Sequence, residues 1–363
     1  MSRKVLISGG AGFIGCHVAR KLLAQGDEIL IFDNLHPQVH TRPGLPKDMP
    51  QGVTFVPGDV TVAENWKTLF RYYLPDTVIH LAAETGTGQS LTESHRHAAV
   101  NVDGTAQLID ALTAARHVPE QFVLTSSRAV YGDGSWRDTA GTVFYPPGRS
   151  RESLEKRQWD PIGPNGQPAE PLPSIAGQTH PSPISIYGAT KLTQEHMLSA
   201  WCRAFGSGLS ILRLQNVYGP GQAPGNPYTG VLTLFARLAR NKQSLDIYED
   251  GNIVRDFVHV DDVAQALVKC VQRPGKDVRL FDIGSGTPTT IEHVARQLAQ
   301  RYGAPAPVVS GKFRDGDVRA ASCSIEAARS ALDYQPQWSL EAGVGSLMEW
   351  LEGALDTPSA PRS

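Results

Sequence analysis

Short apolar runs alternate with longer stretches of mixed polarity through the first half of the chain. Runs at 4–7, 29–32, 53–56, 77–81 and 121–126 have the length and composition of buried strands. Helix-length segments separate them, and several repeat apolar residues every three to four positions, the period of a helix with one buried face. Parallel strands need such crossovers, so the pattern predicts an α/β fold with a Rossmann-type, doubly wound parallel sheet.

The pattern disappears between about 133 and 185, where prolines and glycines are dense and neither helical nor alternating spacing is visible. An irregular connection of more than ~15 residues in a compact domain is usually functional or disordered. We interpret it as an insert, which could be a substrate-covering lid, a contact between subunits or a mobile excursion. Regular patterning returns with a helix expected over 187–205 and a strand over 209–214.

Short strands and helices are mixed in the remainder of the chain. We expect the Rossmann domain to span 1–215 and a smaller mixed α/β lobe to span 216–363, with the ligand between the two. Short strands at 245–248 and 280–283 are assigned to the second lobe. A segment near 252–273 is expected to pack back on the first domain.

The composition is that of an ordinary globular protein. Of the 363 residues, 40% are hydrophobic and 19% are charged, and the formal net charge is −2. This balance argues against nucleic acid or a membrane surface as the main partner. No apolar run approaches the ~20 residues of a membrane helix, and no leader precedes the first strand, so we expect a cytoplasmic protein. The four cysteines lie far apart without a CxxC pair, which predicts neither a metal site nor a disulfide framework.

Three glycines at three-residue spacing follow the first apolar run. Gly9 permits a tight turn, Gly12 lets a phosphate approach the backbone, and Gly15 lets the following helix pack closely on the strand. The N–H groups and the dipole at the start of this helix favour an anion such as a pyrophosphate. Glycine triplets also occur in loops that bind nothing, so further residues are needed to identify a dinucleotide site.

An acidic residue closes the second apolar run. Asp33 lies eighteen residues beyond Gly15, close to the ~20 expected for a carboxylate that accepts hydrogen bonds from the adenosine ribose. A carboxylate here would repel a 2′-phosphate, which favours NAD over NADP as cofactor; a solvated acid at a strand end is the alternative. Asp59 and Val60, after the third run, occupy the place at which such folds meet the adenine.

A tyrosine and a lysine begin the helix expected over 187–205. Tyr187 and Lys191 are four residues apart and would share one helix face, although such pairs are common by chance. A phenol has a pKa near ~10, but a close ammonium and a positive nicotinamide ring favour its anion. Tyr187 could then remove a hydroxyl proton while hydride leaves the same carbon. Ser127, after the fifth run, could hydrogen-bond the reacting oxygen.

These features occur with several longer motifs in one order along the chain. The chain resembles the extended short-chain dehydrogenase/reductases, and within them the nucleotide-sugar epimerases and dehydratases. The matching elements are GGAGFIG at 9–15, Asp33, Asp59, LAA at 81–83, Asn101, SSRAVYG from Ser126, YGATK from Tyr187, LRLQNVYGPGQ from Leu212 and RDFVHVDDVAQAL from Arg255.

The resemblance implies a role for each matching residue. Tyr187 would be the base, Lys191 its electrostatic partner and Ser127 the orienting hydroxyl. NAD would be held by Gly9, Gly12, Phe13, Ile14, Gly15, Asp33, Asn34, Asp59, Val60, Leu81, Ala82, Ala83, Asn101, Ser126, Tyr187, Lys191 and Val217. A nucleoside-diphosphate sugar would be held by Thr87, Ser127, Arg128, Asn216, Arg255, Arg314 and Asp317.

Within the substrate set, the resemblance gives each residue a place along the ligand. Arg255 and Arg314 would clamp the diphosphate, for which a guanidinium fork is suited. Asn216 would contact the sugar or its diphosphate, and Asp317 would lie near the nucleoside. Ordinary surface ion pairs are the alternative for the two arginines.

Residues beside the strand-end hydroxyl distinguish members of this family. Its dehydratases carry an Asp–Glu pair there to eliminate water, whereas this chain has Arg128 and Ala129. The resemblance therefore favours a 4-epimerase, which oxidises C4, rotates the 4-keto sugar and reduces it on the other face. ETGTGQS at 84–90 and VFYP at 143–146 resemble the dTDP-L-rhamnose 4-epimerases, which form dTDP-6-deoxy-L-talose, more than the UDP-galactose 4-epimerases. A UDP-hexose 4-epimerase, a 4-keto-sugar reductase and a catalytically idle NAD-binding regulatory module are the alternatives.

Two further expectations follow from the same resemblance. Some relatives carry cysteine pairs in the insert, but this chain has GPNG at 163–166 there, so no metal-stiffened insert is expected. A homodimer is expected, built from the helices near 91–115 and 187–205. Apolar residues such as Leu108 and Leu112 allow this contact, although they could equally face the core of their own chain.

Overall fold

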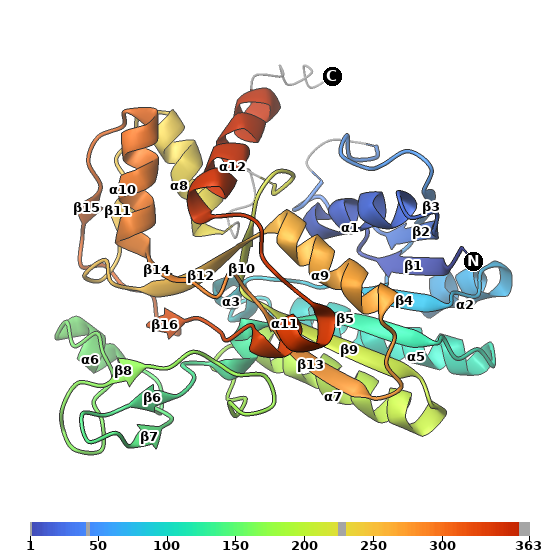
Figure 1. The fold of residues 1–363 in the computed structure, drawn as a ribbon, viewed down its shortest axis with the longest axis horizontal. Coiled ribbons are helices and arrows are strands. Elements are labelled where there is room, and N and C mark those ends of the chain that lie inside the picture. The colour runs from blue at the N-terminus through green and yellow to red at the C-terminus, as the bar shows by residue number, and fades with distance from the viewer. Residues whose placement is uncertain (1, 41–43, 224–229, 356–363) are drawn as a thin grey trace.

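A computed structural model describes residues 2–40, 44–223 and 230–355 of the chain. Its largest feature is a sheet of seven strands, β1 (Lys4–Ser8), β2 (Glu28–Asp33), β3 (Thr54–Pro57), β4 (Thr77–His80), β5 (Gln121–Ser127), β9 (Gly208–Leu214) and β13 (Val278–Ile283). The order is β13-β9-β5-β4-β1-β2-β3, and every neighbouring pair runs parallel (Figure 1). The predicted doubly wound parallel sheet is therefore confirmed.

Helices cover both faces of this sheet. On one face, α1 (Phe13–Leu23) lies against α9 (Val260–Gln272), and both bury apolar side chains against the central strands. On the other face, α2 (Ala63–Tyr72), α5 (Gly104–Ala114) and α7 (Ile186–Phe205) form a second core with the same strands. Because the strands are buried on both faces, they read as continuous apolar runs in the sequence.

Two expected elements differ from the structure. The strand at 280–283, assigned to the second lobe, is the edge strand of the central sheet, because β13 pairs with β9 along its whole length. Periodicity indicates a strand but does not say which strand it pairs with. The helix expected over 91–115 begins with α4 (Ser94–Ala98) and passes through a π-helical turn (Ala99–Asp103) before α5. Leu108 and Leu112 on α5 are fully buried in the core of their own chain.

The insert at 133–185 is ordered, although its sequence shows no pattern. Its regular elements are β6 (Trp136–Arg137), β7 (Val143–Phe144), α6 (Arg151–Glu155) and β8 (Glu170–Pro171). The three strands form a small antiparallel sheet in the order β7-β6-β8. A bridge between Ser174 and Cys323 joins the insert to the C-terminal part of the chain. Strands of two residues are too short for a period to be visible, which is why the sequence indicated only an irregular segment.

The remaining elements of the C-terminal half are short strands and helices. They are β10 (Asn216–Tyr218), α8 (Val231–Arg240), β11 (Asp246–Ile247), β12 (Val254–His259), β14 (Pro288–Thr290), α10 (Ile291–Tyr302), β15 (Val308–Val309), β16 (Ala320–Ala321), α11 (Glu326–Leu332) and α12 (Leu340–Leu355). Helices α8, α10 and α12 share a core of their own, at one side of the molecule in Figure 1. Helix α11 packs instead against β13 of the central sheet. The division of the chain at 215/216 stays a prediction.

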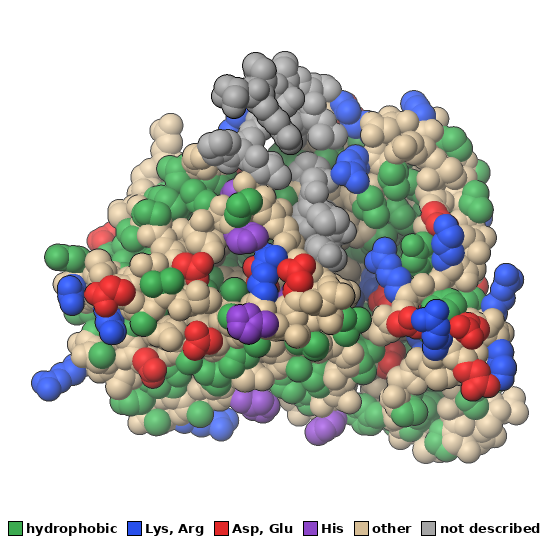
Figure 2. All heavy atoms as spheres, turned by 180° about the vertical axis from the view of Figure 1, so that it is seen from behind, with side chains coloured by type: hydrophobic (Ala, Val, Ile, Leu, Met, Phe, Trp, Pro, Cys, Tyr) green, Lys and Arg blue, Asp and Glu red, His purple; other side chains and the backbone are tan. Residues whose placement is uncertain are grey.

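The surface carries charges of both signs, and the four cysteines form no disulfide. Lys and Arg side chains are interspersed with Asp and Glu on the face shown in Figure 2. Among the described residues, no helix is long and apolar enough to cross a membrane, and no group of three His, Cys, Asp or Glu side chains could hold a metal ion. All four cysteines are buried and unpaired.

Candidate active site

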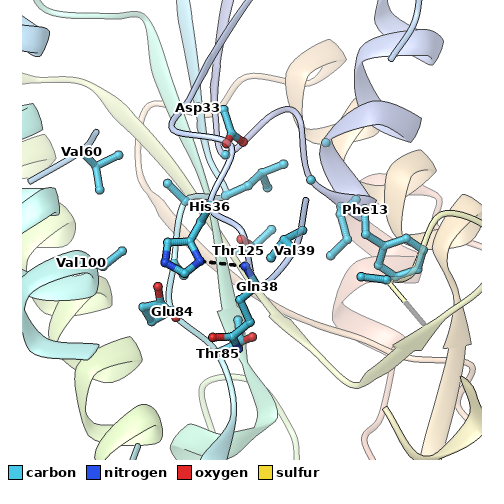
Figure 3. Close-up of a pocket in the computed structure, with 18 of the residues that line it drawn as sticks. Phe13, Asp33, His36, Gln38, Val39, Val60, Glu84, Thr85, Val100 and Thr125 are labelled. Carbon is cyan, nitrogen blue, oxygen red and sulfur yellow. Dashed lines mark hydrogen bonds between the residues drawn. The ribbon is translucent and has the colours of Figure 1, made fainter. Parts of the chain in front are cut away.

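A cavity of about 430 Å³ lies at the carboxyl ends of the central strands, where parallel sheets bind their ligands. Part of its wall, including Asp33, Val60 and Thr125, is seen in Figure 3. Most of the residues expected to hold the cofactor line this cavity: Gly9, Gly12, Phe13, Ile14, Gly15, Asp33, Asn34, Val60, Leu81, Ala82, Ala83, Ser126, Tyr187, Lys191 and Val217. Asp59 and Asn101 are not part of the wall.

The turn between β1 and α1 is as tight as the glycine spacing predicts. Gly9 has a φ of +70°, and a Cβ there would lie 2.6 Å from the backbone nitrogen of Ala82. A Cβ on Gly15 would lie 2.4 Å from the carbonyl oxygen of Gly10. Gly12 is the N-cap of α1, and no side chain of the described residues caps this helix. Its first N–H groups are therefore left for a ligand, and they and the dipole suit an anion.

The Asp33 carboxylate is fixed at the edge of this turn. Its Oδ2 accepts a hydrogen bond from the backbone N–H of Ala11 at 3.1 Å. Its Oδ1 accepts one from the N–H of Leu35 at 2.8 Å. Each oxygen keeps acceptor capacity, because a carboxylate oxygen can accept more than one hydrogen bond. The side chain can therefore bind the hydroxyl groups of a ribose.

Asp59 supports the cavity from outside its wall. Its carboxylate accepts hydrogen bonds from the N–H and the Oγ1 of Thr61, at 2.8 and 2.7 Å, and from the Nδ2 of Asn34 at 2.9 Å. Burial alone would raise the pKa of Asp59, but the hydrogen bonds from Thr61 and Asn34 hold it below its usual value. In this arrangement Asp59 positions Asn34, which does line the cavity.

Asn101 has a similar supporting place in the π-helical turn. Its Oδ1 accepts a hydrogen bond from the N–H of Glu84 at 2.8 Å, and its Nδ2 donates to the carbonyl oxygen of Glu84 at 3.0 Å. The same Nδ2 donates to the Oγ1 of Thr190 at 2.9 Å. Asn101 thereby ties the segment after β4 to the start of α7, so both line the cavity in a fixed relation.

Tyr187, Lys191 and Ser127, the residues predicted to be catalytic, all line this cavity; their roles stay predictions. Ser127 is the last residue of β5, while Tyr187 and Lys191 lie in the first two turns of α7. Gly188 lets α7 approach the strand end, since a Cβ there would lie 2.5 Å from the carbonyl oxygen of Ala129. A side chain at 188 would push Tyr187 away from Ser127.

The charges around Tyr187 suit a group that gives and takes a proton. Burial raises the pKa of Tyr187 above its usual value, and a hydrogen bond with the Ser127 hydroxyl and the charge of the Arg128 guanidinium offset only part of this rise. Burial lowers the pKa of Lys191 to about 7, against the charge of Glu195, which raises it. The phenol is thus shielded from water, which favours its neutral form, and the Arg128 guanidinium is a nearby charge that favours its anion.

Four of the residues expected to hold the substrate form a cluster next to Ser127, in which Arg255 is buried and the other three are half-buried. The Nε of Arg128 donates to the Oδ1 of Asn216 at 3.0 Å. The Nη2 of Arg255 donates to the Oδ1 of Asp317 at 2.7 Å. Burial and the charge of Arg255 lower the pKa of Arg128 to about 10, while Asp317 opposes this. Arg128 donates to a neutral amide and Arg255 to one oxygen of Asp317, so N–H donors of both guanidinium groups can still serve an anionic ligand.

The other two substrate residues lie elsewhere. Thr87 begins the short helix α3 (Thr87–Ser90). The guanidinium of Arg314 lies over the ring of Tyr248, 5.2 Å from its centre. Their contacts with a substrate stay predictions.

Comparison with known proteins agrees with this site. The chain matches the family described as "NAD dependent epimerase/dehydratase family" over residues 5–152 and 162–284. The chain belongs to this family. The predicted resemblance to nucleotide-sugar epimerases and dehydratases is therefore confirmed.

Individual members of the family span almost the whole chain. A dTDP-L-rhamnose 4-epimerase of Burkholderia thailandensis is 51% identical over 354 residues, which cover 98% of this chain and 96% of that protein. A UDP-glucose 4-epimerase of Thermotoga maritima, solved with UDP-glucose, has a TM-score of 0.77 and 28% identity, and the match covers 97% of this chain and 99% of that one. The Thermus thermophilus UDP-glucose 4-epimerase in complex with NAD has a TM-score of 0.75 and 27% identity, with 96% and 99% covered.

NAD is the cofactor of this family, and the residues of the cavity fit it. The glycine turn has no room for a side chain at Gly9 or Gly15, so a pyrophosphate can approach the backbone. Asp33 presents a fixed carboxylate where a 2′-phosphate would be repelled. The prediction of NAD is confirmed; which residues hold it stays a prediction.

Several residues of this family member reach the site without a sequence signal. His36, Gln38 and Arg96 line the cavity, and the N–H of Gln38 donates to the Nδ1 of His36 at 3.2 Å (Figure 3). Arg149, from the insert, donates from its Nη2 to the carbonyl oxygen of Asp317 at 2.7 Å and from its Nη1 to Glu249 at 2.7 Å. His36, Gln38 and Arg149 lie on irregular segments, and Arg96 lies on the five-residue helix α4, which is too short for a period to be visible.

Proposed function

We propose that the protein is a nucleotide-sugar 4-epimerase that interconverts dTDP-L-rhamnose and dTDP-6-deoxy-L-talose. The observation that carries the reaction type is the presence of Tyr187, Lys191 and Ser127 in the same cavity as the glycine turn. The 51% identity with the Burkholderia thailandensis enzyme supports the choice of dTDP-L-rhamnose. Arg128 and Ala129, in place of an acidic pair, support epimerisation over dehydration.

The residues of the chain would divide the work at C4 of the sugar. NAD, when bound, supplies the oxidation and the re-reduction of this carbon. Tyr187 takes the proton of the 4-hydroxyl group and gives it back, and the Ser127 hydroxyl hydrogen-bonds the 4-oxygen while its charge changes. Burial raises the pKa of Tyr187, so its phenolate form depends on positive charges: the Arg128 guanidinium, which lowers this pKa, and, in our proposal, the Lys191 ammonium.

The arginine cluster would hold the other half of the substrate. Arg255 is paired with Asp317, whereas Arg128 donates to the neutral Asn216, so a diphosphate can bind the N–H donors that remain on the two guanidinium groups. Arg128 directly follows Ser127, which places the expected diphosphate site next to the reacting group. The sugar would then lie between the cluster and Tyr187. Its rotation requires that the protein hold the diphosphate tightly and the 4-keto sugar itself loosely.

The proposal is tested with dTDP-L-rhamnose, UDP-glucose and UDP-N-acetylglucosamine in deuterated water, followed by mass and proton spectra of the products. A 4-epimer of dTDP-L-rhamnose with unchanged mass and no deuterium on carbon is expected, because only hydroxyl protons exchange with the solvent. Loss of water would show a dehydratase, and carbon-bound deuterium would show epimerisation at C3 or C5. Turnover of UDP-glucose alone would favour the UDP-hexose 4-epimerase that the structural relatives suggest.

Tyr187→Phe tests the assigned base. The variant should lose epimerase activity and keep its bound NAD, because the phenol oxygen is lost while the glycine turn is unchanged. Activity near that of the wild type would contradict the assignment. Absence of turnover in the wild type with every sugar would leave a regulatory NAD-binding module as the function.

We further propose that the protein is a homodimer in the cytoplasm. Support comes from its resemblance to the short-chain dehydrogenase/reductases and from its composition, with a net charge of −2. Light scattering of the purified protein measures its mass in solution and so tests the dimer. Fractionation of cells tests the cytoplasmic location.

A further inference from the structure

A buried chain of hydrogen bonds runs away from Lys191 into the protein. The Nζ of Lys191 donates to the Oε1 of Gln194 at 2.5 Å. Lys191 is 2% exposed and Gln194 is fully buried, so the contact is shielded from water. An ammonium group in such a place needs an acceptor, and the carboxamide oxygen of Gln194 is one.

The orientation of the Gln194 carboxamide is fixed by its own partners. Its Nε2 donates to the Oγ1 of Thr105 at 2.8 Å and contacts the Nε2 of His80 at 3.3 Å. Thr105 in turn donates to the carbonyl oxygen of Asn101 at 2.7 Å. With the amide nitrogen turned toward Thr105 and His80, the oxygen must face Lys191. Gln194 therefore presents an acceptor to the lysine and cannot turn round without breaking two contacts.

Gln194 is also electrically neutral, so it does not weaken the electrostatic effect of the Lys191 ammonium on the Tyr187 phenol. Glu195, on the next position of α7, is the carboxylate near Lys191, but it is engaged by the Arg213 guanidinium at 2.6 and 2.9 Å and by the Ser126 hydroxyl at 2.5 Å. Glu195 is therefore paired with Arg213, although its charge still raises the pKa of Lys191. Lys191 is left with a direct partner that holds it without cancelling its charge.

The other ionisable groups around Lys191 place no further negative charge in direct contact with its ammonium among the described residues. His80, on β4, stays neutral because burial and the charge of Lys191 lower its pKa to about 3. Arg128, in the turn after β5, also acts on Tyr187, and its charge lowers the pKa of the phenol. Tyr187 and Glu195 lie on α7 with the lysine, and Arg213 lies on β9.

We propose that Gln194 is a positioning residue for the epimerase reaction, because it holds the Lys191 ammonium with a neutral acceptor and leaves the positive charge for Tyr187. The inference rests on the proposed function for its effect on catalysis. Its effect on Tyr187 itself does not depend on which sugar is turned over.

Gln194→Glu is the variant that tests this idea, because it keeps the size and the acceptor and adds a negative charge beside Lys191; it also gives up the amide donor to Thr105 and His80, which Gln194→Leu removes without adding charge. The ion pair should raise the pKa of Tyr187 by about one unit, since a close charge of this kind shifts a neighbouring group by ~1 unit or more. We expect kcat at neutral pH to fall about tenfold and to recover as the pH is raised, because one pKa unit is tenfold in the phenolate fraction. KM should change less than twofold.

Two further variants and one direct readout complete the experiment. Gln300→Glu, at an exposed position of α10, carries the same change away from the site and should behave like the wild type. Gln194→Leu removes the acceptor without adding charge and should lower kcat without recovery at high pH. The pKa of Tyr187 is read from the ultraviolet absorbance of the phenolate, as the difference between each holoprotein and its Tyr187→Phe counterpart.

These readouts separate the possible outcomes. A wild-type pH profile and Tyr187 pKa in Gln194→Glu would overturn the proposal, and so would an equal loss of kcat at every pH. A shifted Tyr187 pKa in a protein that turns over no nucleotide sugar would support the positioning role and refute the proposed function. A shifted pKa with a shifted pH profile of epimerisation is the expected result.

Discussion

Replacing Gly9 by alanine tests the physical basis of the NAD site most directly. The added Cβ would lie 2.6 Å from the nitrogen and 2.7 Å from the Cα of Ala82, and 2.9 Å from the carbonyl carbon of Leu81. Carbon atoms in contact are normally about 3.5–4.0 Å apart. All three atoms belong to the backbone after β4, so no side chain can rotate to make room. The turn and this segment must separate by roughly 1 Å.

The expected size of the effect follows from two separate terms. Gly9 has a φ of +70°, a region that costs an alanine about 1–2 kcal/mol. Overpacking of a closely packed site typically adds about 1–3 kcal/mol. The sum is about 2–5 kcal/mol of unfolding free energy. With an unfolding entropy of about 2.1 cal/mol/K per residue, this lowers Tm by roughly 3–7 °C for a chain of 363 residues.

Gly26→Ala is a matched control for the first term alone. Gly26 has a φ of +84°, and a Cβ there meets nothing within 4 Å. This variant should lose only the conformational part, about 1–2 kcal/mol or roughly 1–3 °C in Tm. It should purify with as much NAD as the wild type, because the turn after β1 is unchanged.

NAD content and affinity distinguish the two variants. Gly9→Ala can relax its overpacking by moving the turn, and binding NAD must then restore the original position. An overpacking energy of about 1–3 kcal/mol should therefore appear as a loss of affinity of roughly 5- to 150-fold. Bound NAD is measured by absorbance after denaturation, and affinity by titration of the NAD-free protein. If Gly9→Ala matched Gly26→Ala in both Tm and NAD affinity, the close approach of Gly9 to Ala82 would not shape the site.

Three further predictions concern the buried charges. Arg213→Met leaves the Glu195 carboxylate buried without its partner, so the free energy of unfolding should fall by about 3–5 kcal/mol. Adding Glu195→Gln to this variant should restore part of the lost stability, and denaturant unfolding measures the stability of both proteins. Arg255→Ala removes a guanidinium beside Asp317 and should raise KM for the nucleotide sugar by about 10- to 150-fold, with NAD content unchanged. Steady-state kinetics measures KM, and an unchanged KM would contradict a role of Arg255 in binding the substrate. His80 has a folded-state pKa of about 3, below its value in the unfolded chain, so its contribution to stability is present above pH ~6.5 and is lost as the pH falls toward 3; unfolding measured across this range should depend less on pH in His80→Gln.

Much of the central sheet and part of the site could be predicted from local spacing. A strand buried on both faces must be apolar along its length, so β1, β2 and β5 appear as uninterrupted runs in the sequence. The tight turn at Gly9 and the shared helix face of Tyr187 and Lys191 also depend only on neighbouring residues. Such features follow from backbone geometry, and the structure confirms that they line one cavity.

The partners of each segment could not be predicted in this way. A run at 280–283 indicates a strand, but only packing decides that β13 pairs with β9 and not with the short strands of the C-terminal half. Arg149 reaches Asp317 because the insert folds back on distant residues, and two-residue strands leave no period by which to expect it.

The division between what the sequence determines and what the fold determines is clearest at Lys191. The order of residues is enough to place Lys191 one helical turn from Tyr187, because four-residue spacing sets their relation. The charges that act on the lysine depend on the folded chain, since Gln194 faces it through contacts with Thr105 and His80, and Arg213 on another strand balances Glu195. Local spacing follows from the geometry of one helix, whereas the electrostatic balance of a buried group depends on every segment packed around it.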